Sequence, residues 1–433
     1  MSKREETIKV DEGKISSEMN KKLPTVPARN EMGENRSAHI LFIVENNTVP
    51  LDIRVWREAR TAREAGYTVS VIAPKNKRYS KSYEIREGIE IYRHYSYEGQ
   101  GGRFDQVVEY ANALFWEFIF CAHIFLTNRF EIIHGANPPD HIFILAMVFK
   151  LFGVKYIFDH HDLSPELYAS KFNGRKKSIF KILRLMEKLS CRISNAIIST
   201  NESYKSHIIE IHRVNPEKVC VVRNDPEINI TSKQSKHDRP HSGKATKLIY
   251  VGTINFQDGL DILIRVVHVL VKELGQKQIV CTVVGDGNSL KCVKQLCNDL
   301  DMTDYFDFKG YVYDRETVQK YINEADICLD TAPKNEINQK STFIKIMEYM
   351  ISGKAIVAFD LDETRFTTDS SAVLVEPGDI VAYAKEIDRL IKDPIVRNEL
   401  GEKAKRRIIE SLNWNNSSKK LMSLYKSMLS TRI

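Results

Sequence analysis

The chain has 433 residues, of which 42% are hydrophobic, and its 64 Lys and Arg outnumber its 57 Asp and Glu to give a formal net charge of +7. This composition excludes a wholly disordered chain and is enough to bury cores in two or three domains. The mild positive excess suits an acidic lipid surface or phosphorylated ligands better than nucleic acid, so we expect no nucleic-acid partner.

Cysteine usage and the first residues predict a cytoplasmic protein. The seven cysteines contain no C-x-x-C pair, which is typical of reduced core residues. Residues 1–36 are rich in Lys, Glu, Asn and Ser, and without an apolar run we expect a disordered tail rather than a signal peptide or an anchor. The most hydrophobic window, 107–126, is interrupted by polar residues such as Glu109 and Glu117, which predicts a buried or interface-seeking helix rather than a membrane span.

From residue 39 onward, short β-branched runs alternate with helical patterns, which predicts parallel α/β sheets. A polar stretch without periodicity interrupts the series at 225–246 and is interpreted as a linker. We therefore expect two doubly wound domains, 37–224 and 247–412, that face each other across a crevice. The strands are expected at 39–44, 67–73, 89–94, 130–134, 154–159, 196–200, 219–223, 247–251, 279–284, 305–309, 326–330, 355–359 and 373–375.

Residues 339–363 are interpreted as a helix followed at once by a buried strand. Ser341 or Thr342 is the expected N-cap, and Gly353 the expected end. Free N–H groups, the positive end of the helix dipole, Lys340 and two hydroxyls would converge there on an anion, and phosphate fits. The alternative is a surface helix on which Lys345 and Glu348 form a solvated pair.

The run Lys345-x-x-Glu348-Tyr-Met-x-x-Gly353-Lys-x-x-Val resembles the donor-binding helix of retaining GT-B glycosyltransferases of family four, and the resemblance extends from about residue 40 to 428. It implies two Rossmann-like domains, with the helix within 413–433 crossing back onto the first. It also implies a nucleotide-diphosphate sugar as donor, held at the ribose by Glu348. The acceptor would be a glycan or polyprenyl-linked saccharide in bacterial polysaccharide assembly, and no cofactor is expected.

The loop after the first strand lacks the Gly-x-Gly-x-x-Gly of dinucleotide sites. The resemblance places this loop over donor and acceptor, whereas the alternative is that its residues serve only as loop and cap residues. The expected strand 130–134 ends at His134, and the resemblance assigns this strand end to the acceptor side. His134 could equally be a core histidine whose hydrogen bonds are satisfied within the fold. The candidates in these two segments are Asn46, Asn47, Asp52, Arg54, His134 and Asn137.

Residues 158–167 place two histidines and an acid at the mouth of the first domain. Metal ligation by His160, His161 and Asp162 is disfavoured, because adjacent residues on an extended segment point to opposite sides. The resemblance implies that the imidazole of His161 contacts the donor sugar. We expect His161, Asp162 and Lys340 to be the catalytic residues.

A basic stripe of Lys177, Lys181, Arg184 and Lys188 lies beside an apolar stripe in the following helical segment. Such a run is commonly a solvated face. A basic stripe beside an apolar one also suits an anionic membrane surface, which would make the protein peripheral on the inner leaflet.

In the second domain, Gly252 and Thr253 lie where the family carries its phosphate loop, and Gly285 and Gly287 resemble the turn beside the nucleotide base. The sequence departs from the family here, because Thr253 and Asp258 replace an Arg and a Lys. The family's first Glu is Lys340 in this chain. Lys340 would either restore the neutralisation of the diphosphate or meet an acidic donor sugar.

Two Asp-x-Asp triplets, at 299–301 and 360–362, are interpreted as charged turns, so we expect no metal in the site. These features together predict a metal-independent retaining glycosyltransferase. The missing cations and the missing Glu leave two alternatives open, a sugar-nucleotide-binding subunit without chemistry and a sugar-nucleotide epimerase.

Overall fold

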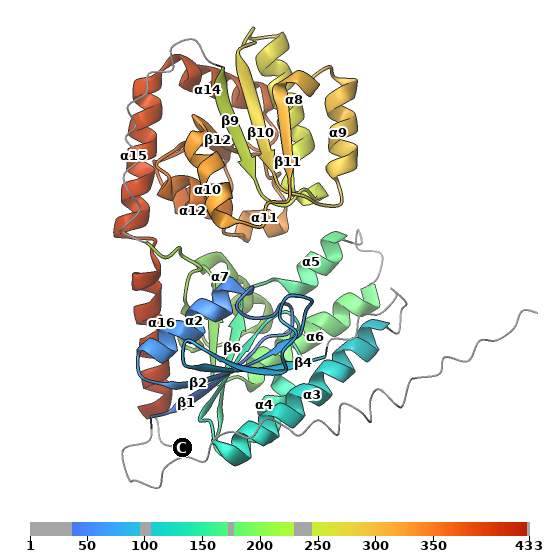
Figure 1. Cartoon of the computed structure of the whole chain (residues 1–433), viewed down its shortest axis with the longest axis vertical. Helices are drawn as coiled ribbons and strands as arrows, with labels where there is room; N and C mark the ends of the chain where they lie inside the picture. Colours follow the sequence, from blue (N-terminus) through green and yellow to red (C-terminus); the bar gives the residue numbers. More distant parts are fainter. Residues whose placement is uncertain (1–36, 96–104, 172–176, 229–244, 431–433) are drawn as a thin grey trace, which may run out of the picture.

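The computed structural model describes residues 37–95, 105–171, 177–228 and 245–430. The expected tail at 1–36 and most of the expected linker lie outside these residues. The described chain forms two α/β domains stacked along the long axis of the molecule, with a long C-terminal helical arm running beside both (Figure 1).

The first domain holds an eight-stranded sheet in the order β3-β4-β2-β1-β5-β6-β7-β8. All neighbouring strands are parallel except β3 and β4. Its elements are β1 (His39–Ile43), α2 (Ile53–Glu64), β2 (Thr68–Pro74), β3 (Tyr83–Arg86), β4 (Ile89–His94), α3 (Asp105–Thr127), β5 (Ile132–Ala136), α4 (Phe143–Lys150), β6 (Lys155–His160), α5 (Ser164–Lys171), α6 (Lys177–Ile193), β7 (Ala196–Ser199), α7 (Glu202–His212) and β8 (Val219–Val221).

The second domain holds a six-stranded parallel sheet in the order β11-β10-β9-β12-β13-β14, which is the doubly wound strand order of the Rossmann fold. Its elements are β9 (Thr246–Val251), α8 (Leu260–Lys272), β10 (Ile279–Val284), α9 (Leu290–Asp299), β11 (Phe306–Gly310), α10 (Arg315–Glu324), β12 (Ile327–Asp330), α11 (Glu336–Lys340), α12 (Ile344–Ile351), β13 (Ala355–Phe359), α13 (Asp362–Thr368), β14 (Val373–Val375), α14 (Ile380–Lys392) and α15 (Pro394–Glu410).

The predicted fold class is confirmed, and every expected strand is present within two residues of its expected start. The prediction missed β3, which is short, half-exposed and antiparallel to β4. Its sequence, Tyr-Glu-Ile-Arg, has no buried run to distinguish it from a loop. In both domains the β-branched strands are almost wholly buried because helices cover both faces of the sheet.

The helix α16 (Trp414–Ser430) packs on the first domain rather than the second (Figure 1). Trp414 Nε1 donates to Thr61 Oγ1 at 2.8 Å, and its ring lies 4.3 Å from the Arg57 guanidinium. Further along, Leu421, Tyr425 and Met428 join the core of the first domain. The chain therefore passes between the domains twice, and the arm ties them together.

The helix expected after residue 341 is present as α12, which begins at Ile344, later than predicted. An extended segment, Ser341–Phe343, separates it from the short α11, which the prediction did not include. Neither expected cap is used, because Phe343 occupies the N-cap position without a side-chain hydrogen bond. Gly353, with φ +64°, follows the helix end as predicted.

Residues 108–127 within α3 form a helix long and apolar enough to cross a membrane, judged by length and composition. Only 28% of this window is buried. The helix lies against α4 on one face of the first sheet (Figure 1). The sequence predicted a buried or interface-seeking helix. In the structure most of this window is not buried, so the prediction of a buried helix is wrong.

Candidate functional site

The carboxyl ends of β9 and β12 lie at the switch point of the second sheet, where open α/β sheets bind ligands. The segment between α11 and α12 crosses this edge and contacts the first domain. Asn201 Nδ2 donates to the Lys340 carbonyl at 2.8 Å, and the Tyr204 hydroxyl lies 3.1 Å from Ser341 Oγ. The two domains therefore meet at the segment that the sequence singled out.

The two hydroxyls expected to face phosphate are already bonded within the protein. Ser341 Oγ donates to the Ile337 carbonyl at 2.8 Å. Thr342 Oγ1 donates to Glu363 at 3.3 Å and accepts from Asn201 at 3.0 Å and from Arg223 at 3.2 Å. Their predicted role as phosphate ligands is corrected to contacts between the domains. The Ile346 N–H donates to the Phe343 carbonyl at 3.1 Å, and the N–H groups before it have no partner within α12, as in any α-helix.

The side chain of Lys345 is only 10% exposed and lies beneath this segment instead of on a solvated face. Its Nζ donates to Asp330 Oδ1 at 2.9 Å and to the Tyr250 hydroxyl at 3.2 Å. Burial is the largest single influence and lowers the pKa of Lys345, but the charges of Asp330 and Tyr250 and the hydrogen bond to Asp330 together outweigh burial and raise this pKa. The ammonium is therefore charged at neutral pH, and the solvated pair with Glu348 does not form.

Glycines let two turns approach each other beside Lys345. A Cβ on Gly285 would lie 1.8 Å from the Gly252 carbonyl oxygen, and a Cβ on Gly287 would lie 2.4 Å from that of Ile254. A Cβ on Gly252 would lie 3.4 Å from Lys345 Nζ. The predicted glycine turns thus meet in space, with a buried cation at their side, and only glycine allows the approach.

The loop after β9 carries acid where the family carries a cation. Thr253 Oγ1 donates to Asp258 Oδ2 at 2.9 Å, and the Asn255 N–H donates to the same oxygen at 2.8 Å. Thr253 is exposed. Asp258 closes a capping box and offers no positive charge, so Lys345 is the cation that the fold places against this loop.

Lys340 and Glu348 lie on opposite sides of the break before α12. Lys340 Nζ lies 3.1 Å from His207 Nδ1 of the first domain and 3.5 Å from Glu336. Glu348 is half-buried, with Arg315 at 3.9 Å, and burial raises the pKa of its carboxyl group. Lys340 therefore lies at the boundary of the two domains, whereas Glu348 lies on the second domain alone.

In the first domain, Asn137 organises the predicted histidine loop. Its Oδ1 accepts from the N–H groups of His161 at 2.7 Å and Asp162 at 3.1 Å, and its Nδ2 donates to the Asp162 carbonyl at 2.8 Å. Nε2 of His161 has no hydrogen-bond partner among the described residues. Asn137 thus positions a loop whose imidazole has one buried nitrogen without a hydrogen-bond partner among the described residues.

Arg54 and His134 are not acceptor-side residues but members of a buried ionic group. The Arg54 guanidinium donates to both oxygens of Asp159, at 2.8 and 3.1 Å, and pairs with Glu58 at 3.0 Å. His134 is fully buried, and its Nδ1 lies 2.7 Å from the hydroxyl of Tyr425 on α16. His134 is thus a core histidine, as the alternative supposed, although its Nε2, 3.4 Å from Glu58 and 3.5 Å from Asp159, has no hydrogen-bond partner among the described residues.

Of the remaining candidates in the first loop, one is a helix cap and two are exposed. Asp52 is the N-cap of α2 and accepts from the Val55 N–H at 3.0 Å. Asn46 and Asn47 are exposed at the carboxyl end of β1, where a ligand in the crevice can reach them. The cap explains Asp52 without a ligand, whereas nothing within the fold requires an asparagine at position 46.

Sequence reasoning missed several residues at the domain boundary. Glu363 accepts from Ser203 Oγ at 2.7 Å and from Arg223 at 3.4 Å, so it joins α13 to the first domain. Asp330 and Tyr250, which hold Lys345, were also missed. A signal for Asp330 existed, because it ends a strand at the sheet edge that binds ligands.

One residue of the predicted basic stripe on α6, Arg184, is paired with acids of the first domain. Arg184 pairs with Glu187 at 3.1 Å and with Glu166, so its charge is satisfied within the fold. Lys181 is exposed and Lys188 is half-buried. The side chain of Lys177 lies outside the described residues.

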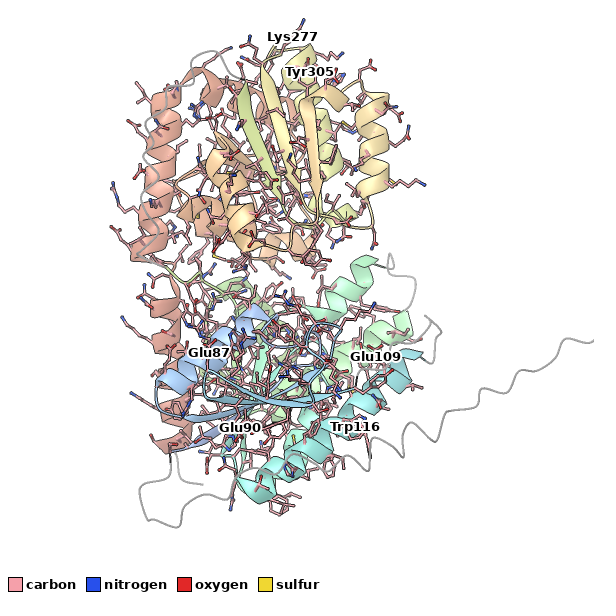
Figure 2. All side chains as sticks on the ribbon, viewed as in Figure 1. Glu87, Glu90, Glu109, Trp116, Lys277 and Tyr305 are labelled. Carbon is pink, nitrogen blue, oxygen red and sulfur yellow. The ribbon has the colours of Figure 1, made fainter. Side chains whose placement is uncertain are left out.

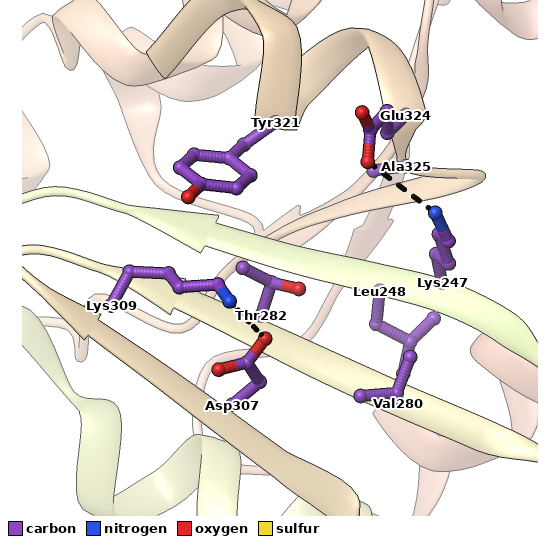
Figure 3. Close-up of a pocket in the computed structure, with 9 residues that line it drawn as sticks. All are labelled: Lys247, Leu248, Val280, Thr282, Asp307, Lys309, Tyr321, Glu324 and Ala325. Carbon is purple, nitrogen blue, oxygen red and sulfur yellow. Dashed lines mark hydrogen bonds and ion pairs between the residues drawn. The ribbon is translucent and has the colours of Figure 1, made fainter. Parts of the chain in front are cut away.

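A separate pocket of about 150 Å³ lies between the second sheet and α10 (Figure 3). Its cations are paired with its acids, Lys247 with Glu324 at 3.4 Å and Lys309 with Asp307 at 2.6 Å. It contains none of the predicted site residues, and we assign it no ligand.

Comparison with known proteins shows similarity to glycosyltransferases in both domains. The model for glycosyl transferases group 1 matches residues 232–407, and the model for Glycosyltransferase Family 4 matches residues 52–224. An uncharacterised glycosyltransferase of Methanocaldococcus jannaschii is 22% identical over 69% of this chain and 76% of its own length.

Solved structures of similar proteins share the fold. Sucrose-phosphate synthase from Thermosynechococcus elongatus superposes with a TM-score of 0.71 at 16% identity, over 91% of this chain and 99% of that one. Anabaena HepE in complex with UDP-glucose superposes with a TM-score of 0.65 at 14% identity, over 90% of this chain and 99% of that one. With two family models spanning both domains and two Rossmann-like sheets meeting at one edge, the chain is a glycosyltransferase of the GT-B type.

Proposed function

We propose that the protein transfers a sugar from a nucleotide-diphosphate donor to a glycan or lipid-linked saccharide, with retention of anomeric configuration. Cell-surface polysaccharide assembly is the process that this chemistry would serve. The UDP-glucose complex of HepE, a protein of the same fold, supports a nucleotide-sugar donor. The proposal places the diphosphate between the glycine turns and the amino end of α12.

The buried ammonium of Lys345 is the observation that carries the proposal. Its Nζ lies 3.4 Å from where a Cβ on Gly252 would lie, at the switch point of the second sheet, and Lys345 belongs to the first turn of α12, where the first N–H groups have no partner within the helix. A fixed cation and a helix dipole aimed at one point stabilise the charge that develops on a leaving diphosphate. The protein thereby replaces at 345 the positive charge that Thr253 and Asp258 do not supply.

The remaining steps follow from the first domain. The free Nε2 of His161, held in place by Asn137, would contact the donor sugar, while Glu348 would accept from the ribose hydroxyls. The acceptor hydroxyl attacks, the glycosidic bond to the diphosphate breaks, and the departing phosphate takes the proton. Since Lys345 and the helix end carry the charge, no metal ion is assigned to the donor site.

Assays with radiolabelled nucleotide sugars and polyprenyl-diphosphate saccharides test the proposal. We expect transfer by the purified protein, with retention read from the anomeric NMR signals of the product. Lys345→Met should lower kcat at least about tenfold, whereas Lys345→Arg should keep more of it. Tight donor binding without transfer or hydrolysis would favour a non-catalytic subunit, and conversion of donor without acceptor would favour an epimerase.

The role of Lys340 is tested by Lys340→Glu across a panel of donors. A switch of preference away from acidic sugars would show that Lys340 meets a uronate. A uniform loss of donor affinity would show that it neutralises the diphosphate. Because Lys340 also contacts His207, the double variant with His207→Gln separates either effect from a change in how the domains meet.

We also propose that the first domain docks on anionic membrane. On α6, the apolar side chains of Ile182 and Leu185 are 54% and 52% exposed beside Lys181, and Leu151 at the end of α4 is 84% exposed. Cations near anionic lipid contribute about 1 kcal/mol each. The double variant Lys181→Glu/Lys188→Glu should sediment less with phosphatidylserine vesicles, and Lys385→Glu on the second domain should not. Equal sedimentation of all three proteins would refute docking through α6.

A further inference from the structure

Three groups of carboxylates and histidines lie close enough to hold an ion within the part of the chain that the structure describes. In two of these groups the acids already form ion pairs with an arginine or a lysine. Arg54 pairs with both acids of the Glu58–His134–Asp159 group, and Arg184 and Lys340 pair with the acids of the Glu166–His207–Glu336 group. The third group, Glu45, Glu117 and His141, forms no ion pair with any described lysine or arginine.

The geometry of this third group is that of converging ligands. His141 Nε2 lies 3.1 Å from Glu45 Oε2 and 3.8 Å from Glu117 Oε2, and the ligand atoms of all three lie within 4.8 Å of one another. Despite these short distances, Nε2 and the Glu45 oxygen do not form a hydrogen bond with acceptable angles. The three ligand atoms therefore lie around one common space.

Burial makes the arrangement costly without a partner. Glu117 is fully buried on α3, and neither of its oxygens has a hydrogen-bond partner among the described residues. Buried carboxylates are ordinarily paired with a cation or bound to a metal, because moving an unpaired charge from water into the protein costs free energy. Two such carboxylates around one imidazole leave negative charge that the imidazole by itself does not balance.

We propose that Glu45, Glu117 and His141 bind a divalent transition-metal ion, for which Zn²⁺ is the best fit. Carboxylate and imidazole ligands together suit borderline ions of this class, and ligand distances of about 2.0–2.2 Å place the metal at the common centre of the three atoms. The remaining coordination positions belong to water.

The ion would be a positioning device rather than part of the transfer reaction. Glu45 directly precedes the Asn46–Asn47 loop at the end of β1, His141 directly follows the Asn137–Asp140 segment, and Glu117 is on α3. A shared ion would tie both loops at the crevice edge to the helix beneath them. This site is separate from Lys345 and the glycine turns, so it does not depend on the proposed donor chemistry.

Metal binding to the untagged full-length protein tests the inference. After dialysis against a chelator, we expect the protein to bind one Zn²⁺ per chain by titration and elemental analysis, and to unfold at higher temperature with Zn²⁺ present. Glu117→Gln and His141→Asn should weaken binding more than about tenfold. Glu109 (labelled in Figure 2) is on the same helix but is not one of the three ligands, and its charge acts on Glu45 only through space, so Glu109→Gln should weaken binding far less.

If the variants fail to fold, Co²⁺ binding to the original protein still tests the inference, because it needs no variant. Co²⁺ in the original protein should give visible d–d absorption typical of nitrogen and oxygen ligands, which Zn²⁺ abolishes by competition. If the original protein binds neither ion, or if the folded variants bind as tightly as it does, the inference is overturned and the group is a buried imidazolium between two carboxylates.

Discussion

The two sides of the crevice are built by different means. On the first domain, the edge is shaped by buried polar side chains, in which Asn137 fixes the His161 loop and Arg54 joins β6 to α2. On the second domain, the edge is shaped by backbone packed on backbone, with Gly285 against Gly252. The first side therefore depends on charge and hydrogen bonding, and the second depends on the absence of side-chain atoms.

The largest effect is expected from Gly285→Ala. The new Cβ would lie 1.8 Å from a carbonyl oxygen of the backbone, which cannot move away as a side chain would. We expect the free energy of unfolding to fall by more than about 5 kcal/mol. Chemical denaturation followed by circular dichroism measures it.

Gly310→Ala is the matched control for this steric effect. Gly310 also has a positive φ, +70°, but a Cβ there meets nothing within 4 Å. The cost should be only the conformational strain, about 1–2 kcal/mol. Equal losses at both positions would mean that backbone conformation, and not close approach, decides the second side.

On the first side, Arg54→Leu should leave Asp159 and Glu58 buried without their cation. Removing one partner of a buried ion pair costs about 3–5 kcal/mol, and we expect a loss of that size in denaturant unfolding. Arg60→Leu on the same helix breaks only half-exposed pairs and should cost at most about 1 kcal/mol. A small loss in Arg54→Leu would show that the charges are screened or neutral.

A pH experiment sharpens the same contrast. Burial raises the pKa of Asp140 to about 7, and its Oδ2 has no hydrogen-bond partner among the described residues. The unfolded pKa is about 3.9, so the folded state holds a proton that the unfolded state releases between these values. Stability should therefore fall as pH rises from about 4 to 7, by about 1.4 kcal/mol per unit at most.

Asp140→Asn removes this titration while keeping an oxygen that accepts from Asn137, which lies 3.0 Å from Oδ1. The variant should lose less stability than the original protein between pH 4 and pH 7, as followed by thermal unfolding across that range. Parallel pH profiles for the two proteins would contradict a raised pKa at position 140.

The smallest effect concerns Asp52. Asp52→Ala removes the N-cap of α2 and should cost about 1 kcal/mol of stability, whereas Asp52→Asn keeps the cap. Neither change should alter the KM for acceptor, because the carboxylate is used by the Val55 N–H. A raised acceptor KM in Asp52→Asn would return this residue to the ligand site.

Much of the architecture is readable from local patterns. Most strands are buried runs rich in β-branched residues, and each is short and bounded by polar segments, so their positions follow from composition. The glycine turns at 252 and 285 were also identified from the sequence. The half-exposed strand β3 was missed because it has no such run.

The roles of the charged residues depended on the tertiary structure. Lys345 reads as a surface residue on a helical wheel, yet Asp330 and Tyr250 from other elements surround it. Arg54 and His134 read as loop and strand-end residues, yet α16 covers His134 from 291 positions away in the chain. Local spacing carries no information about partners so distant.

The two doubly wound sheets, their approximate limits and the glycine turns at the crevice can be read from the amino-acid pattern, because periodicity and backbone conformation are local properties. Which charges are paired, which histidine nitrogen lacks a partner and which acids lack a cation became clear from the folded chain. Burial and charge balance arise where distant segments meet, and no short window of sequence contains both partners.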